Sequence, residues 1–168
     1  SSVQMDTITF NAAVDACKTH GEWALALQFL SAMTLRSVRK NAITCSAAIS
    51  ACERGREWLQ ALQLLSTMAR TSIQIDSIAC NSAISACEKC AEWRQASALM
   101  GAMANSSIRM DVFTCGAAIS ACGNSGQWAQ ALQLLSTMPQ SSIQMNAITC
   151  NAAMLACEKG GEWTRALA

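Results

Sequence analysis

The chain has 168 residues, of which 52% are hydrophobic and 14% charged, and its formal net charge is +1. This near-neutral balance excludes a strong global basic field, so any binding of nucleic acid would rest on local contacts. No apolar run is long enough to span a bilayer, which argues against membrane insertion. The single proline, Pro139, and the many small residues favour long helical stretches.

Five segments align without a gap, each starting 35 residues after the one before (positions 6, 41, 76, 111 and 146). Each starts with an acidic residue or its amide: Asp6, Asn41, Asp76, Asp111 and Asn146. The predicted repeats form a single array over 7–41, 42–76, 77–111, 112–146 and, in part, 147–168. Because the array begins and stops inside repeats, we expect it to be a fragment of a longer one.

Each repeat is expected to form a hairpin of two helices. In the second repeat the first helix is predicted roughly from Ile43 to Arg54, where apolar residues recur at helical spacing after an asparagine cap. A glycine near residue 55 is expected to break the chain into a tight turn, and the second helix is predicted to begin at Glu57. Such short helices bury their apolar stripes only by stacking on neighbouring hairpins, which predicts an all-α solenoid.

The string NAITCSAAISACERGREWLQALQLLSTM resembles the pentatricopeptide consensus, with its V-T-Y-N-T-L-I start, C-K-x-G turn, E-A-L-x-L-F helix and closing E-M. The agreement extends over every repeat, in the P-type 35-residue form. The Cys- and Trp-rich style looks like an algal variant, with Phe10 and then cysteines in place of the consensus tyrosine. The resemblance implies a right-handed α-solenoid of helix-turn-helix repeats that is not itself an enzyme and needs no cofactor.

By the same resemblance, the first helices line a concave groove that holds single-stranded RNA at about one base per repeat. Counted from the residue after the cap, the second residue sandwiches a base, the fifth hydrogen-bonds its edge, and the last tunes the choice. The implied base-sandwiching residues are Ile8, Ile43, Ile78, Phe113 and Ile148. The implied base-reading residues are Asn11, Asn41, Ser46, Asp76, Asn81, Asp111, Gly116, Asn146 and Asn151.

The chemistry of the reading places suits these roles. Asparagine carries both a donor and an acceptor for a pyrimidine edge, whereas serine offers one smaller hydroxyl and leaves room for a purine. By resemblance to the family code, Asn with Asn in the first repeat favours C, Ser with Asp in the second favours G, and Asn with Asp in the third favours U. Gly116 has no side chain with which to read. The implied ligand is 5′-C-G-U-(purine)-(pyrimidine)-3′.

Each of these assignments has a structural alternative. Asp or Asn at the repeat starts would be chosen as an N-cap in any helical repeat. The fifth place varies while its neighbours repeat, which suits either a reading code or a tolerant exposed site. Three basic residues near the end of the first helix would, by resemblance, meet RNA phosphates: Arg54, Lys89 and Lys159. Thr19 and Asn124 occupy that place in other repeats, so a solvated turn is the alternative.

The ten cysteines are predicted to be small buried hydrophobic residues. Pairs such as Cys45 and Cys52 lie two turns apart on one helix face, which is too far for a disulfide. Cys87 and Cys90 form a lone C-x-x-C without the second pair that a zinc site would need, so no metal is predicted. The only histidine, His20, is expected in a solvated turn.

Two functions remain open from the sequence. The first is an organellar RNA-binding adaptor, in a mitochondrion or chloroplast, that acts in RNA processing, stability, editing or translation. The second is a structural subunit of an organellar assembly, such as a ribosome or membrane complex, whose groove holds protein or structural RNA. The weak net charge, the interrupted row of cations and Gly116 favour the second function.

Overall fold

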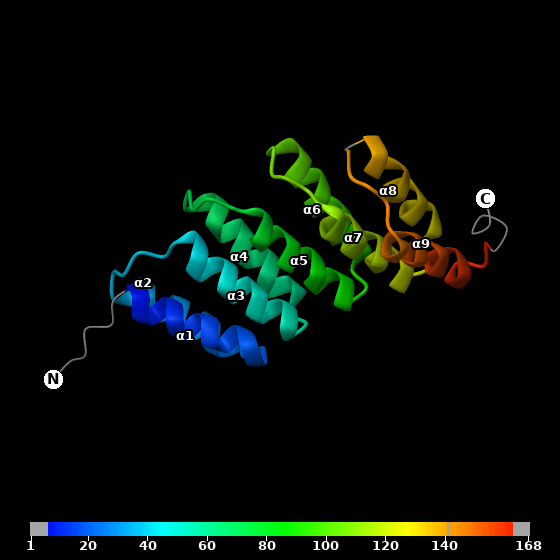
Figure 1. Cartoon of the computed structure of the whole chain (residues 1–168). Coiled ribbons are helices and arrows are strands. Elements are labelled where there is room, and N and C mark those ends of the chain that lie inside the picture. The colour runs from blue at the N-terminus through cyan, green and yellow to red at the C-terminus, as the bar shows by residue number, and fades with distance from the viewer. Residues whose placement is uncertain (1–6, 141, 163–168) are drawn as a thin grey trace. The chain divides into compact units, whose positions relative to one another are not determined.

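The computed structural model describes residues 7–140 and 142–162, and the regular structure of these residues is helical (Figure 1). The first helices of the hairpins are α1 (Thr7–His20), α3 (Ala42–Arg54), α5 (Ser77–Lys89), α7 (Val112–Asn124) and α9 (Ala147–Lys159). The second helices are α2 (Trp23–Leu35), α4 (Trp58–Arg70), α6 (Trp93–Asn105) and α8 (Trp128–Gln140). The predicted succession of helical hairpins is therefore confirmed, while the cap Asp6 and the start of the last second helix lie outside the described residues.

The predicted helix bounds in the second repeat differ from the observed ones by one residue. The first helix begins at Ala42, one residue before the predicted Ile43, and ends at Arg54 as predicted. The second helix begins at Trp58, one residue after the predicted Glu57, which is its N-cap. His20 is exposed as expected, but it is the last residue of α1 and does not lie in the turn.

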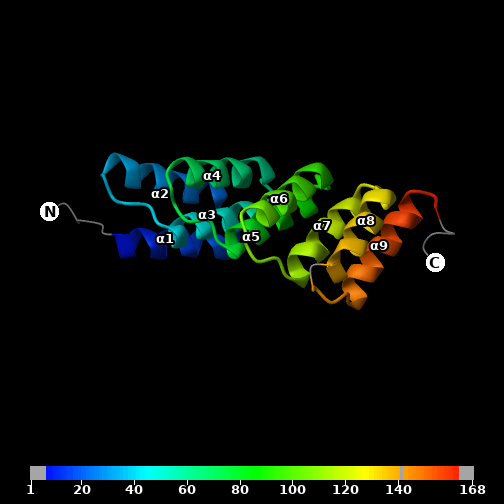
Figure 2. The same cartoon turned by 90° about the horizontal axis from the view of Figure 1, so that it is seen from above.

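The chain divides into two compact units, residues 1–86 and 87–168. In the first unit α1 and α3 lie side by side, and α2 packs against both, so that α2 and α4 form a second layer (Figure 2). In the second unit α7 and α9 lie side by side, and α8 packs against both. Each unit therefore has a layer of first helices covered on one side by second helices.

Small residues allow the helices to approach closely in these layers. Ala48, Ile49 and Cys52 of α3 and Ala61 of α4 are each 0% exposed. The cysteines have free thiols, and all but Cys90 and Cys150 are fully buried: Cys17, Cys45, Cys52, Cys80, Cys87, Cys115, Cys122 and Cys157. Their predicted role as small buried hydrophobic residues is confirmed at these positions.

The turn inside each hairpin contains a left-handed residue, at Gly21, Arg56, Ala91, Gly126 and Gly161. The turn predicted near residue 55 is confirmed, and its left-handed residue is Arg56, with a φ of 60°, whereas Gly55 has an ordinary φ of −73°. The turn closes as a Schellman motif, in which Glu57 N donates to Cys52 O at 2.9 Å. Glycine is favoured at position 55 because the indole ring of Trp23 packs against it, and a Cβ there would lie 2.4 Å from Trp23 Cδ1.

Candidate nucleic-acid interface

A large apolar side chain is exposed at the second residue of every first helix. The exposed fractions lie between 62% and 76%, for Ile8, Ile43, Ile78, Phe113 and Ile148. Isolated exposed apolar residues are common on protein surfaces, but recurrence at one place in five repeats is a pattern. These are the residues that the sequence predicts to sandwich bases, and the structure leaves each of them open to a ligand.

The fifth residue of each repeat lies three positions after this apolar residue, and residues three apart share one face of a helix. The exposure of these fifth residues differs from repeat to repeat. Asn11 and Asn81 are half-buried, Asn151 is exposed, Gly116 is buried, and Ser46 is only 7% exposed. The predicted sandwiching and reading places are therefore neighbours on one helix face in each repeat.

The last residue of a repeat is the N-cap of the next first helix, as the sequence predicts. Asn41 Oδ1 accepts from Thr44 N at 2.9 Å, and Asp76 Oδ1 accepts from Ala79 N at 2.8 Å. The caps Asp111 and Asn146 accept from the corresponding backbone N–H at 2.9 Å, each within a capping box. Capping uses one side-chain oxygen, so the second carboxylate oxygen or the amide nitrogen stays available for another partner.

The fifth and last residues of one repeat meet in the first unit. In the second repeat Ser46 Oγ donates to Asp76 Oδ1 at 3.3 Å. In the first repeat the hydroxyl of Thr44 lies between the pair, in contact with Asn11 Oδ1 and 2.8 Å from Asn41 Oδ1. The structure thus joins the two members of a predicted reading pair across the step from one hairpin to the next.

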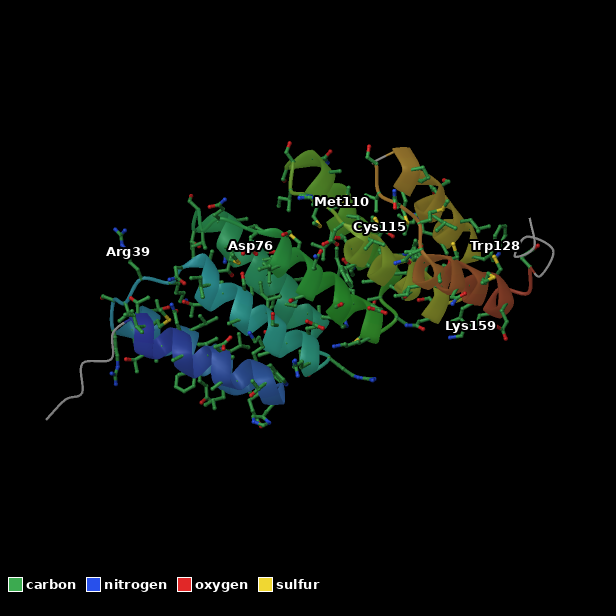
Figure 3. The ribbon with its side chains drawn as sticks, viewed as in Figure 1. Arg39, Asp76, Met110, Cys115, Trp128 and Lys159 are labelled. Carbon is green, nitrogen blue, oxygen red and sulfur yellow. The ribbon has the colours of Figure 1, made fainter. Side chains whose placement is uncertain are left out.

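The three predicted phosphate-binding cations are exposed, and they lie at the C-terminal ends of their helices: Arg54, Lys89 and Lys159. A first helix of 13 residues is about 20 Å long, which separates these cations from the N-caps at the other end. Figure 3 shows this placement for Asp76, at the start of α5, and Lys159, at the end of α9.

Arg54 also has a structural role within the first unit. Its Nη1 donates to the backbone oxygen of Thr19 at 3.3 Å, near the C-terminus of α1. At the same place in the fourth repeat, Asn124 Nδ2 donates to Glu88 O at 3.2 Å. Donors at this place therefore satisfy carbonyl groups at the end of a neighbouring first helix, where a positive charge is also favourable.

Two hollows lie between successive links that join the hairpins. One, of about 690 Å³, is lined in part by Arg39, Lys40 and Asn41, and Arg39 is labelled in Figure 3. The other, of about 710 Å³, is lined in part by Arg109 and Asp111. These cations beside the caps were not predicted from the sequence. A signal was present, because arginine stands two residues before two of the caps (Arg39 and Arg109), while glutamine stands at the equivalent place before the others.

Neither a metal centre nor a membrane span emerges from residues 7–140 and 142–162. Among their side chains, no group of three or more His, Cys, Asp or Glu residues is arranged to hold a metal ion. None of their helices is both long and apolar enough to cross a bilayer.

Comparison with solved structures shows the fold. The pentatricopeptide repeat protein PPR10 from maize matches with a TM-score of 0.83 at 13% identity, covering 96% of this chain and 23% of that one. The same maize protein in complex with an 18-nt psaJ RNA element gives 0.79 at 20% identity, covering 99% and 24%. The chain therefore spans about a quarter of the length of the maize protein. The all-α helical-repeat solenoid predicted from the sequence is confirmed.

A shorter solved structure matches over most of its own length. It is the PPR domain of Arabidopsis thaliana protein-only RNase P 1 in complex with tRNA, with a TM-score of 0.76 at 12% identity, covering 92% of this chain and 83% of that one. No curated protein matches the sequence. A family model described as pentatricopeptide repeat-containing protein matches residues 1–103, and one for the pentatricopeptide repeat domain matches residues 98–160. The chain belongs to the pentatricopeptide repeat family.

Proposed function

We propose that the chain is an RNA-binding adaptor that holds single-stranded RNA against its first helices at one base per repeat. The observation that carries this proposal is the exposed apolar residue at the second place of each first helix, with exposures between 62% and 76%. Beside each of them lies the predicted reading place. The RNA complexes of the maize protein and of the Arabidopsis PPR domain support RNA as the class of ligand.

The apolar residues supply sequence-independent affinity. A base that covers an exposed isoleucine or phenylalanine removes apolar surface from water on both partners, which is favourable. Phe113 also offers an aromatic face on which a base can stack. Since every base has such a face, these contacts hold the strand without selecting its sequence.

The polar pairs supply the selection. Ser46 with Asp76 presents a short hydroxyl and a carboxylate, and we assign it to G, while Asn11 with Asn41 is assigned to C. Asn81 with Asp111 is assigned to U. Gly116 with Asn146 selects weakly among purines, and Asn151 faces a pyrimidine. The proposed ligand is therefore 5′-C-G-U-(purine)-(pyrimidine)-3′.

Phosphate contacts are few in this proposal. Arg54, Lys89 and Lys159 are candidates, and Arg39, Lys40 and Arg109 lie closer to the caps. With a net charge of +1 and few such contacts, we expect binding to weaken only gently with salt. Replacement of Arg39 by Gln should reduce the slope of log K against log salt for all sequences alike.

The cellular role that we propose is in a mitochondrion or chloroplast. Selection of a short RNA segment suits RNA processing, stability, editing or translation. In this role the repeats position the RNA, and a partner or a further domain supplies any chemistry.

Binding selection from a randomised single-stranded RNA pool tests the proposal. The chain is titrated at low salt, and the bound pool is sequenced. Enrichment of C-G-U in register would support base reading, and a duplex RNA of the same sequence serves as the control. If no single-stranded RNA binds at low salt, the proposal is wrong.

A structural role in an organellar assembly is the second candidate. Gly116 offers no reading side chain, and Arg54 and Asn124 both bind carbonyl groups of the chain itself. These observations suit a scaffold whose groove holds a protein segment or structural RNA. Equal binding of every RNA in the selection, without enrichment, would favour this role.

A further inference from the structure

We propose that Thr44 is a positioning residue that sets the base preference of the first repeat, an inference that rests on the proposed RNA-binding function. Thr44 is the third residue of the second repeat and is 0% exposed, so it does not touch a base itself. Its hydroxyl contacts Asn11 and Asn41, which are the two members of the preceding reading pair. It therefore acts on the RNA only through these two amides.

Counting protons determines how the three side chains are joined. A hydroxyl carries one proton, so Thr44 cannot donate to the oxygens of both amides. Asn41 Oδ1 is fixed as an acceptor, because Thr44 N donates to it at 2.9 Å. The Thr44 hydroxyl then donates to that same oxygen at 2.8 Å, and its own oxygen is left as an acceptor.

The contact with Asn11 is satisfied when the amide of Asn11 turns its nitrogen toward Thr44. The two ends of an asparagine amide have nearly the same shape, so the hydrogen-bond network decides the orientation. With its nitrogen donating to Thr44 Oγ1, Asn11 directs its carbonyl oxygen away from Thr44. The half-buried Asn11 then offers an acceptor to a base that lies on Ile8.

This orientation gives a reason for choosing C over U. The two pyrimidines differ in that cytosine carries an amino donor where uracil carries a carbonyl acceptor. A carbonyl oxygen on Asn11 accepts from that amino group, whereas it would face the carbonyl of uracil without a hydrogen bond. The Thr44 hydroxyl thus selects which end of the Asn11 amide reads the base.

Other repeats use the third residue differently. Thr114 holds this place after Asn81, and its hydroxyl is part of a capping box, where it accepts from Asp111 N at 3.1 Å and donates to Asp111 Oδ1 at 3.0 Å. Ala79 stands at this place after the second repeat and has no hydroxyl, and there Ser46 bonds to Asp76 directly. Thr149 holds the place after Gly116, where no side chain needs orienting. Its hydroxyl accepts from Asn146 N at 3.1 Å and donates to Asn146 O at 2.9 Å, closing the capping box.

The test compares Thr44→Val, which removes the hydroxyl at nearly constant shape, with Thr44→Ser, which keeps it. Each chain is titrated with an oligoadenylate that carries C-G-U-A-C at its centre and with one that carries U-G-U-A-C. We expect the unchanged chain and Thr44→Ser to prefer the first RNA by about two- to tenfold, the worth of one neutral hydrogen bond. Thr44→Val should bind both RNAs equally.

A purely structural role for Thr44 would give a different result. In that case Thr44→Val would lower the melting temperature and reduce the affinity for both RNAs by the same factor, with the preference for C unchanged. That outcome would overturn the inference. The preference for G at the second base serves as an internal control, and it should survive Thr44→Val. If Thr44→Val does not fold, Thr44→Ala replaces it, since alanine occupies this place naturally at Ala79.

The proposed function and this inference fail in distinguishable ways. If the unchanged chain binds neither RNA, the RNA-binding function itself is wrong. If the unchanged chain prefers C and Thr44→Val retains that preference, the function stands and only the role of Thr44 is wrong.

Discussion

Ser46 Oγ lies 3.3 Å from Asp76 Oδ1, although Asp76 caps the following first helix and the two residues are 30 positions apart. The carboxylate is thereby tied to both hairpins, through the cap and through the serine. A base edge that reaches this pair meets a hydroxyl and a carboxylate whose positions are already fixed. Such preorganisation reduces the ordering cost of binding.

We therefore expect Ser46→Ala to lower the preference for G over A at the second base by about two- to tenfold. Competition titrations with RNAs that differ only at this base measure the effect. Ser50→Ala is the matched control, because Ser50 lies one turn further along α3 and shares a 2.9 Å hydrogen bond with Ser82. If both variants change base preference equally, the Ser46–Asp76 pair does not read the base.

Alanine substitutions of the exposed Phe113 and the buried Ile119, both in α7, should distinguish effects on RNA affinity from effects on folding stability. Phe113 is 75% exposed, so Phe113→Ala should leave the melting temperature nearly unchanged. It should weaken RNA binding by about 1–3 kcal/mol if a base stacks on the ring. Ile119 is 0% exposed, and Ile119→Ala should cost about 2–5 kcal/mol of folding stability. Unaltered RNA affinity in Phe113→Ala would remove this residue from the interface.

The sequence predicted the features that each repeat carries locally. Caps such as Asn41 follow from residue type and position, and the resemblance to the pentatricopeptide pattern implied a base-contacting role for the exposed Ile43. The contact of Thr44 with Asn11 was not predictable, since it joins two hairpins and depends on which way a hydroxyl turns. The turn near residue 55 was predictable, but the close approach of Gly55 to Trp23 was not, since it depends on how two hairpins pack.

Arg56 adopts a φ of 60°, while Gly21 and Gly126 occupy the same turn position in other repeats. A side chain in this conformation costs about 1–2 kcal/mol, and glycine avoids the clash but loses more entropy on folding. We expect Arg56→Gly to raise the free energy of unfolding by up to about 1 kcal/mol. Urea denaturation measures this change. The reverse change, Gly21→Ala, should destabilise the protein, and stabilisation by it would contradict the argument.

Gly55 and Gly101 should respond oppositely to alanine. A Cβ on Gly55 would lie 2.4 Å from Trp23 Cδ1, so the indole ring must shift. We expect a loss of about 1–3 kcal/mol from this overpacking. Gly101 lies within α6, and a Cβ there would have no heavy atom within 4 Å. Gly101→Ala should therefore stabilise the helix by about 0.5–1 kcal/mol. Thermal unfolding of the two variants should shift in opposite directions.

Buried thiols make the fold sensitive to alkaline pH. Burial, reinforced by the charge of Glu57, raises the pKa of Cys52 from its ordinary value of 9.0 to about 12. Burial likewise raises the pKa of Cys87 to about 12. Above pH 9 the unfolded chain releases these protons while the folded chain keeps them. The unfolded state then binds fewer protons, so folding stability falls as pH rises from about 9 toward 12.

Urea denaturation at a series of pH values checks this sign. Measurements kept below about pH 10 limit the contribution of lysine, which titrates at about 10.4. Cys52→Ala removes one of the thiols with a raised pKa, so the stability of this variant should fall less steeply as pH rises. The loss of the buried sulfur atom itself lowers stability at neutral pH. A thiol reagent gives an independent readout, because protonated and buried thiols should react slowly until the chain unfolds. Rapid reaction of Cys52 in the folded chain at pH 8 would contradict its burial, and an unchanged pH slope in Cys52→Ala would show that its thiol is not the group that titrates.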